Sequence, residues 1–331
     1  MQPQIMRLTV VMALVAMCRL ANCQDEIQFD GPVPEAQLVE VTCDYNQTGA
    51  QSYPPVVFWH GMGDTATGSV TIDKMALERR FPGMRVFSIQ IGNSSLDDGM
   101  ASYFSNMNQQ VLQACDSILA NEHIKQVGRF NAVGFSQGSQ FLRALAQRCP
   151  LRENGIKLGN LVSLGGQHQG VYGLPKCSSP MLCRYIRYLL TKGAYQSDVQ
   201  NHLVQAQYWH DPLREQQYKA RNIFLADINN ENSINETYRS NLMKLDNFVL
   251  VLFEQDEMVI PRESSLFGFY APGQTRDILP LESTPLWEED RLGLKQMSQE
   301  GRLKIISIPG HHLQYHMTWF LTEIAEKYLV A

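Results

Sequence analysis

One pentapeptide constrains the fold of this chain more than any other feature. Residues 134–138 read Gly-Phe-Ser-Gln-Gly, which is a G-x-S-x-G pattern. An apolar segment at 130–133 runs into it, and a segment with helical periodicity at 137–147 runs out of it. A strand that turns at once into a helix leaves no room for side chains at the two glycines and holds the serine hydroxyl above the sheet edge. We therefore predict a strand–turn–helix unit with Ser136 as the candidate nucleophile.

The surrounding sequence alternates between strand-like and helix-like segments. Further runs rich in apolar residues predict strands at 56–59, 84–91, 158–164, 248–253 and 303–308. Segments with helical periodicity lie between most of them. This alternation predicts an α/β protein with a mostly parallel central sheet flanked by helices.

The alternation stops from about 165 to 246. Helix-like segments at 181–190, 197–206 and 238–245 are separated there by turns rich in Gly, Pro and Asn. We interpret this region as a largely helical cap inserted between two strands of one sheet. A separate second domain is the alternative.

A serine nucleophile needs a general base, and the base needs an acid that orients it. The loop after the penultimate predicted strand contains Asp256, with Glu254 and Glu257 as alternatives. The loop after the last predicted strand contains His311 and His312. In hydrolases built on this turn the chain order is serine, acid, histidine, and both loops lie where that order requires them. Spacing alone hardly separates the two histidines.

The oxyanion hole should combine two backbone N–H groups. One is that of Gln137, and the other comes from the loop after the first strand, where residues 60–63 read His-Gly-Met-Gly. We expect Met62 to be this second donor and interpret His60 as a structural residue of the loop. Gln167 is expected to border the site, because its loop leaves the sheet at the same edge. No Cys/His pattern has metal-ligand spacing, so we expect neither a metal nor another cofactor.

The N-terminus predicts export. An arginine precedes an apolar run at 8–17, and small residues follow up to residue 23. This layout is typical of a secretory signal peptide over 1–23, and the run is too short to span a bilayer. We expect the mature domain, 24–331, to be free in a lumen. Glycosylation sequons at Asn46, Asn93 and Asn235 agree with this route.

Two of the seven cysteines precede residue 24. The other five form an odd set for an oxidising compartment: Cys43, Cys115, Cys149, Cys177 and Cys183. We interpret them as two disulfides with one cysteine left over, Cys43.

Composition excludes other classes of protein. The chain is 44% hydrophobic and 18% charged, which is typical of a globular protein and not of a disordered one. Its net charge is -5, and no basic block is dense enough to suggest nucleic acid as a partner.

Several longer strings have no general chemical meaning and carry a resemblance to one family. They are 59–64 (WHGMGD), 131–138 (NAVGFSQG), 165–171 (GGQHQGV) and 208–212 (YWHDP). With these strings the chain resembles the palmitoyl-protein thioesterases, in particular the type 1 lysosomal members, which have the α/β-hydrolase fold. The resemblance covers nearly the whole chain from about Pro54 onward.

The resemblance implies hydrolysis of long-chain fatty acyl thioesters, with S-palmitoylated proteins or peptides as substrates. It implies a lysosomal location, with secretion through the signal peptide. It carries the nucleophile onto Ser136, the acid onto Asp256 and the base onto His312. Ser139 stands where relatives usually have a second glycine, a small change inside the helix.

The resemblance also implies residues beyond the triad. It favours the disulfides Cys115–Cys149 and Cys177–Cys183. We expect an apolar groove for the acyl chain formed by Leu203, Val204 and Gln205 of the inserted region, which the resemblance suggests, and by Met258, which lies beside the acid.

Two rival interpretations differ in class. A lysosomal or secreted lipase or carboxylesterase would use the same triad on oxygen esters. A catalytically inactive hydrolase fold that serves as a binding protein is the non-enzyme alternative. Such proteins usually lose the serine or the histidine, and this chain has both.

Overall fold

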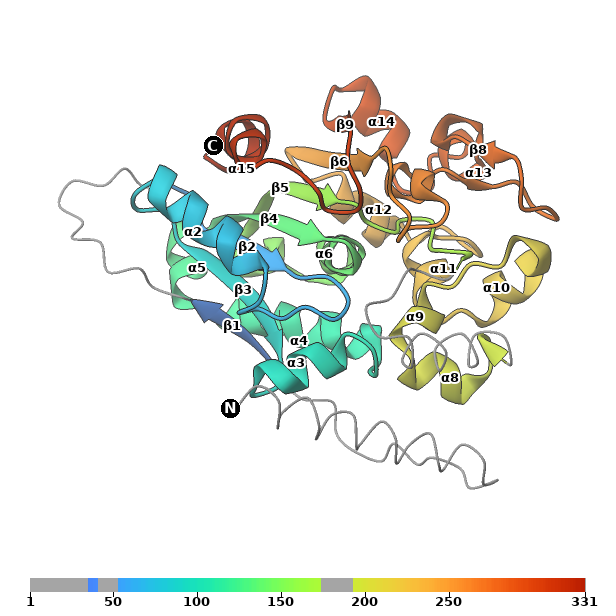
Figure 1. The fold of residues 1–331 in the computed structure, drawn as a ribbon, viewed down its shortest axis with the longest axis horizontal. Coiled ribbons are helices and arrows are strands. Elements are labelled where there is room, and N and C mark those ends of the chain that lie inside the picture. Colours follow the sequence, from blue (N-terminus) through green and yellow to red (C-terminus); the bar gives the residue numbers. More distant parts are fainter. Residues whose placement is uncertain (1–34, 41–52, 174–192, 331) are drawn as a thin grey trace.

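The computed structural model describes residues 35–40, 53–173 and 193–330 (Figure 1). The expected signal peptide at 1–23 lies outside these residues. So do four further predicted positions: Cys43, Asn46, Cys177 and Cys183. Within the described residues, no helix is both long enough and apolar enough to cross a membrane.

The described chain forms a seven-stranded sheet in the order β1-β3-β2-β4-β5-β6-β9. All neighbours pair in parallel except β1 and β3, which are antiparallel. The strands are β1 (Ala36–Glu40), β2 (Val56–Trp59), β3 (Val86–Ile91), β4 (Arg129–Phe135), β5 (Lys157–Leu164), β6 (Asn247–Phe253) and β9 (Leu303–Ile308). The mostly parallel sheet predicted from the sequence is confirmed.

The edge strand β1 was not expected. It reads AQLVE and pairs antiparallel with β3, with Ala36 opposite Ile91. Its side chains are half-buried or exposed, because it lies at the edge of the sheet. A short strand with one covered side lacks the continuous apolar run that marks the buried parallel strands.

Helices cover both faces of the sheet (Figure 1). Along β2, Val56 and Phe58 point into one core, and Val57 and Trp59 point into the other, as the two-residue period of a strand requires. The first core lies under α2 (Val70–Arg80) and the C-terminal helix, which is α15 (Met317–Trp319) continued by a π-helical stretch (Phe320–Leu329). The second lies under α3 (Ser95–Ala101), α4 (Met107–Ala120), α5 (Glu122–Val127) and α6 (Gln137–Arg148).

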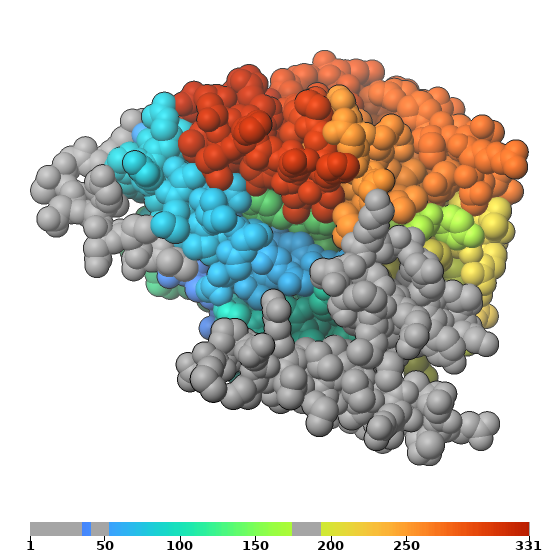
Figure 2. Space-filling model, in the orientation of Figure 1, coloured from blue at the N-terminus to red at the C-terminus, as the bar shows by residue number. Residues whose placement is uncertain are grey.

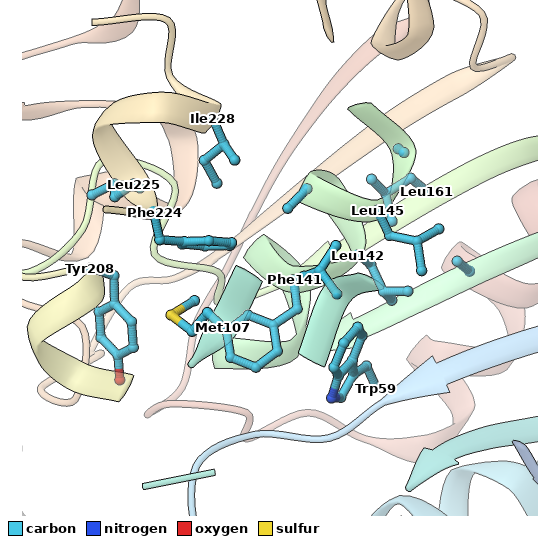
Figure 3. Close-up of a cluster of buried hydrophobic side chains, with 14 of the residues drawn as sticks. Trp59, Met107, Phe141, Leu142, Leu145, Leu161, Tyr208, Phe224, Leu225 and Ile228 are labelled. Atoms are coloured by element: carbon cyan, nitrogen blue, oxygen red, sulfur yellow. The ribbon is translucent and has the colours of Figure 1, made fainter. Parts of the chain in front are cut away.

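The segment between β5 and β6 contributes short helices, although these two strands pair directly with each other. The helices are α8 (Ser197–His202), α9 (Val204–Gln207), α10 (Glu215–Arg221), α11 (Leu225–Ile228) and α12 (Glu236–Leu242). Helices α8 to α11 lie together beyond one end of the sheet (Figure 1). Aromatic and aliphatic side chains join them to α6, as Phe224 and Phe141 do with ring centroids 6.1 Å apart (Figure 3).

The helix expected over 197–206 is two helices. They meet at Leu203, which has an extended backbone with φ -110° and ψ 109°. The N–H of Val204 donates to the carbonyl oxygen of Tyr103 at 3.0 Å instead of continuing the helix. A contact with a distant segment therefore overrides the local periodicity.

The chain between β6 and β9 adds small elements. They are a two-stranded hairpin of β7 (Phe269–Tyr270) and β8 (Ile278–Leu279), followed by α13 (Pro285–Glu288) and α14 (Leu294–Gln299). A disulfide joins Cys115 of α4 to Cys149 at the end of α6, so the implied Cys115–Cys149 pairing is confirmed.

Candidate active site

Ser136 lies in the sharp turn between β4 and α6. Its φ is 53°, a left-handed conformation that is uncommon for a residue with a side chain. The glycines around it permit the turn. A Cβ atom at Gly134 would lie 2.3 Å from Cα of Ser139, and one at Gly138 would lie 2.1 Å from the carbonyl oxygen of Trp59. The strained turn predicted from G-x-S-x-G is therefore present, with its glycines in contact with backbone.

The structure brings Ser136, His312 and Asp256 together in one hydrogen-bonded line. Nε2 of His312 lies 2.8 Å from Oγ of Ser136, and Nδ1 lies 2.6 Å from Oδ2 of Asp256. Oδ1 of Asp256 accepts hydrogen bonds from the backbone N–H groups of Met258 at 2.8 Å and Val259 at 3.0 Å. Because the carboxylate only accepts, Nδ1 of His312 carries a proton. The Nε2 lone pair is then left to accept from the serine hydroxyl.

The alternatives left open by the sequence lie elsewhere. His311 is exposed, and its Nδ1 lies 3.1 Å from a backbone carbonyl oxygen of the acid loop. Glu254 is exposed and accepts a hydrogen bond from a serine of β9 at 3.1 Å. Glu257 is exposed as well. Of these candidates, His312 lies within hydrogen-bond distance of Ser136, and Asp256 lies within hydrogen-bond distance of His312.

The loop after β2 passes directly beside the nucleophile. A Cβ atom at Gly61 would lie 3.1 Å from Cβ and 3.8 Å from Oγ of Ser136. Met62 is the next residue in this loop. Gln137 begins α6, and an N–H in the first turn of a helix has no acceptor within that helix. Gln137 therefore follows Ser136 directly, and Met62 follows the glycine that lies beside it.

His60 fixes the start of this loop. It is buried, with Nε2 3.0 Å from Oδ1 of Asp98 and Nδ1 2.9 Å from the carbonyl oxygen of Gly61. Asp98 also accepts from the backbone N–H groups of Ile91 at 2.8 Å and Ala66 at 2.7 Å. Burial lowers the pKa of His60, but the hydrogen bond and charge of Asp98 outweigh it, and the net pKa is raised. These contacts agree with a structural role for His60.

Gln167 touches the nucleophile itself. Its Nε2 donates to Oγ of Ser136 at 3.0 Å, and its Oε1 accepts from Nε2 of Gln140 at 3.3 Å. The side chain is buried. The sequence predicted only that Gln167 borders the site, and the structure places its amide in direct contact with Oγ of Ser136.

A buried arginine holds the loop that carries Gln167. Arg143, on α6, donates from Nε to Nδ1 of His168 at 3.2 Å and from a terminal nitrogen to Oδ1 of Asn229 at 2.8 Å. It also donates to the carbonyl oxygen of Ile228 at 2.9 Å. Burial lowers the pKa of Arg143 to about 9. Sequence reasoning missed Arg143, whose only signal is a charged residue on the apolar side of an amphipathic helix.

His168 is neutral in this arrangement. Its Nδ1 accepts from Arg143, so the proton lies on Nε2, which is 2.8 Å from Oγ of Ser163. Burial and the neighbouring guanidinium hold the pKa of His168 well below its usual range. His168 therefore serves as scaffolding for the Gln167 loop.

The residues expected to bind the acyl chain lie in two parts of the fold: Met258 is half-buried in the acid loop, and the other three lie at the junction of α8 and α9. Leu203 and Val204 are buried in the core between the inserted helices and the domain. Gln205 donates from Nε2 to the carbonyl oxygen of Ser102 at 3.1 Å, and Gln137 donates to the same oxygen at 3.1 Å. Gln205 is thus linked through one carbonyl group to the residue that follows the nucleophile.

Two of the predicted glycosylation sites lie on the described surface. Asn93 is exposed, and its Oδ1 accepts from Nε2 of Gln37 at 2.8 Å. Asn235 is exposed at the start of α12, where its Oδ1 accepts from the N–H groups of Thr237 and Tyr238. Both side chains are exposed, as a glycan acceptor must be.

Across 35–40, 53–173 and 193–330, no three His, Cys, Asp or Glu side chains are grouped so that they could hold a metal ion. The described site offers the hydroxyl of Ser136, the imidazole of His312, the carboxylate of Asp256 and nearby backbone N–H groups. This set of groups is sufficient for acyl transfer through a covalent intermediate.

Comparison with known proteins adds independent findings. The sequence model of a family described as palmitoyl protein thioesterase matches residues 55–312. The chain is 47% identical over 279 residues to palmitoyl-protein thioesterase 1 of Caenorhabditis elegans, covering 83% of this chain and 92% of the relative. It is 35% identical over 252 residues to palmitoyl-protein thioesterase 3 of Dictyostelium discoideum, covering 75% and 81%.

A more distant relative is named as a lysosomal enzyme. The lysosomal thioesterase PPT2 homolog of Drosophila melanogaster is 28% identical over 276 residues, covering 80% of this chain and 88% of the relative. Among solved structures, the type II thioesterase BorB from the borrelidin biosynthetic cluster is similar, with a TM-score of 0.46 and 15% identity. That match covers 89% of this chain and 96% of the other.

Proposed function

Because the chain belongs to the palmitoyl-protein thioesterase family, we propose that it removes palmitoyl groups from S-acylated cysteines of proteins by hydrolysing the thioester. The observation that carries the proposal is the hydrogen-bonded line from Asp256 through His312 to Ser136. It supplies an activated nucleophile at the position where this fold carries one.

In the proposed reaction each proton has a path. Oγ of Ser136 transfers its proton to Nε2 of His312 and attacks the acyl carbonyl carbon. The negative charge on the carbonyl oxygen is stabilised by the N–H groups of Met62 and Gln137. The C–S bond then breaks, and the departing sulfur takes the proton from His312. A water molecule, deprotonated by His312, hydrolyses the acyl-enzyme and releases the fatty acid.

Gln167 donates to the same serine oxygen before the attack. This hydrogen bond stabilises negative charge that builds on Oγ as its proton leaves. Asp256 keeps the proton of His312 on Nδ1 throughout, because it accepts from that nitrogen.

The acyl chain is proposed to bind in a groove formed by Leu203, Val204, Gln205 and Met258. Each buried CH₂ of the chain contributes about 0.8 kcal/mol, so even partial coverage would dominate substrate binding. Leu203→Ala should raise KM for palmitoyl thioesters more than for butyryl thioesters. An equal change in KM for both chain lengths would show that Leu203 does not line the groove.

The route through the cell is part of the proposal. Residues 1–23 act as a signal peptide, and 24–331 form the mature hydrolase domain with a helical cap at about 165–246. We propose a lysosomal location with some secretion. The names of relatives such as the Drosophila lysosomal thioesterase support this location. Microscopy of a tagged chain with and without residues 1–23 tests it.

One experiment decides between thioesterase and lipase or carboxylesterase. The purified protein is assayed with palmitoyl-CoA and with an oxygen ester of the same chain length. We expect a higher kcat/KM on the thioester and no activity of the Ser136→Ala variant on either substrate. A preference for the oxygen ester would favour the lipase, and a Ser136→Ala variant with unchanged activity would reject the assigned nucleophile.

A further inference from the structure

The turn that carries His312 is held from two sides. On the side of the acid loop, the N–H of Gln255 donates to the carbonyl oxygen of Gly310 at 2.9 Å, and the Gln255 side chain accepts from the N–H of Gly310. On the other side, the hydroxyl of Tyr315 donates to Oδ1 of Asp73 at 2.7 Å. This second link joins the turn to α2, a different part of the chain.

The ring of Tyr315 is packed close to the base. It stacks on Phe253 with centroids 6.3 Å apart and an interplanar angle of 26°, and it contacts Phe320 at 5.7 Å. Phe253 also contacts the ring of His312 at 6.3 Å. Tyr315 and His312 therefore share one aromatic neighbour, and a shift of one ring is transmitted to the other.

Asp73 receives this hydrogen bond inside the protein. It is 8% exposed and lies on α2, which is adjacent to the C-terminal segment on the face shown in Figure 2. A surface pair between Arg80 and Glu326, 2.6 Å apart, joins the same two elements further along. A buried carboxyl group needs hydrogen-bond partners, and Tyr315 supplies one from across the interface.

We propose that Asp73 and Tyr315 are positioning residues, whose hydrogen bond anchors the His312 turn to α2 and keeps Nε2 of His312 in line with Oγ of Ser136. The inference rests on the proposed function, because it assigns His312 as the base. It adds a link outside the triad that controls where the base lies.

The anchor responds to pH. Burial raises the pKa of Asp73 to about 6; the Tyr315 hydrogen bond opposes this shift, and the charge of Asp64 in the loop before α2 adds to it. Of the other ionisable groups nearby, Lys74 lies 4.0 Å from Glu78 along the same helix, and His316 is exposed. A carboxylate accepts more strongly than a carboxylic acid, so the anchor weakens as the pH falls through about 6.

The test is a double-mutant cycle on the full chain, with palmitoyl-CoA as the substrate at pH 7. Tyr315→Phe keeps the ring and removes the donor. We expect it to lower kcat about 5- to 10-fold, the loss of one hydrogen bond, with KM changed less than about twofold. In an Asp73→Asn background the same change should lower kcat only about twofold, because the charged acceptor is already gone.

Tyr218→Phe is the matched control. Among the described residues the Tyr218 hydroxyl has no hydrogen-bond partner, although the side chain is fully buried. Its removal should leave kcat unchanged. The positioning role is wrong if Tyr315→Phe and Tyr218→Phe change kcat equally. It is also wrong if the losses of kcat in Asp73→Asn and Tyr315→Phe simply multiply in the double variant, which would show no coupling between the two residues.

The pH profile gives a second readout that does not depend on the Tyr315 variant. The kcat/KM of the wild-type protein should fall more steeply between pH 6.5 and about 4.5 than that of Asp73→Asn, since the wild type loses the Asp73 carboxylate over this range and the variant has none to lose. Identical slopes overturn the proposal even if Tyr315→Phe does not fold. Failure of the proposed function is distinguishable, because it appears as unchanged activity in Ser136→Ala.

Discussion

The catalytic edge of the sheet and the inserted segment are held by different kinds of interaction. At the edge, backbone packs against backbone, as where Gly138 lies against the carbonyl oxygen of Trp59. Between α6 and the inserted segment, buried polar side chains bond to one another across long stretches of chain, with Arg143 of α6 and His168 at the centre. Local backbone geometry fixes the position of Ser136, whereas a distributed network of side chains fixes the position of the Gln167 amide that touches it.

The largest expected effect separates the two adjacent histidines at the catalytic edge. His312→Ala should lower kcat by about 10⁴-fold or more, because the base is lost, while folding is retained. His311→Ala is the control; it should lower kcat less than about threefold, since that ring is exposed and bonded only to backbone. Thioester hydrolysis by both purified variants checks this. A reversed order would move the base to His311.

A second prediction tests the network. Arg143→Met leaves Nδ1 of His168 and Oδ1 of Asn229 without their donor. Two buried acceptors lose their donor at about 1–3 kcal/mol each, so we expect a loss of about 2–6 kcal/mol in the free energy of unfolding, measured with urea. Arg80→Met is the control, because its pair with Glu326 is exposed, and its loss should stay below about 1 kcal/mol. Equal small losses would mean that the inserted segment does not depend on this network.

A third prediction concerns pH and the interface between α2 and the C-terminal turn. Asp73 has a pKa of about 6 in the fold against an ordinary value of 3.8, which corresponds to about 3 kcal/mol. Because the folded pKa is raised, this stability is present below pH 3.8 and is lost as the pH rises through about 6. Asp73→Asn should therefore gain stability relative to the wild type between pH 4.5 and 7. Urea unfolding of both proteins at pH 4.5 and at pH 7 measures their free energies of unfolding. A difference between the two proteins that is the same at both pH values would contradict the raised pKa.

The sequence predicted the parts of the molecule that local pattern determines. The parallel strands are rich in apolar residues, and the turn at Ser136 is marked by its glycines, so both could be predicted. The split at Leu203 could not, because it results from a hydrogen bond between Val204 and the distant Tyr103. The Arg143 network and the Asp73–Tyr315 link also join residues that are far apart in sequence, and no local pattern marks such pairs.

The direct pairing of β5 with β6 has a consequence for the chain while it is being synthesised. About 80 residues separate these neighbours along the chain, so at roughly 5–20 residues per second the edge of β5 waits on the order of 4–16 s for its partner to emerge. During that interval an apolar strand with unpaired N–H and carbonyl groups is a template for aggregation. Nascent chains of this protein should therefore require chaperone protection from the completion of β5 until β6 has emerged from the ribosome.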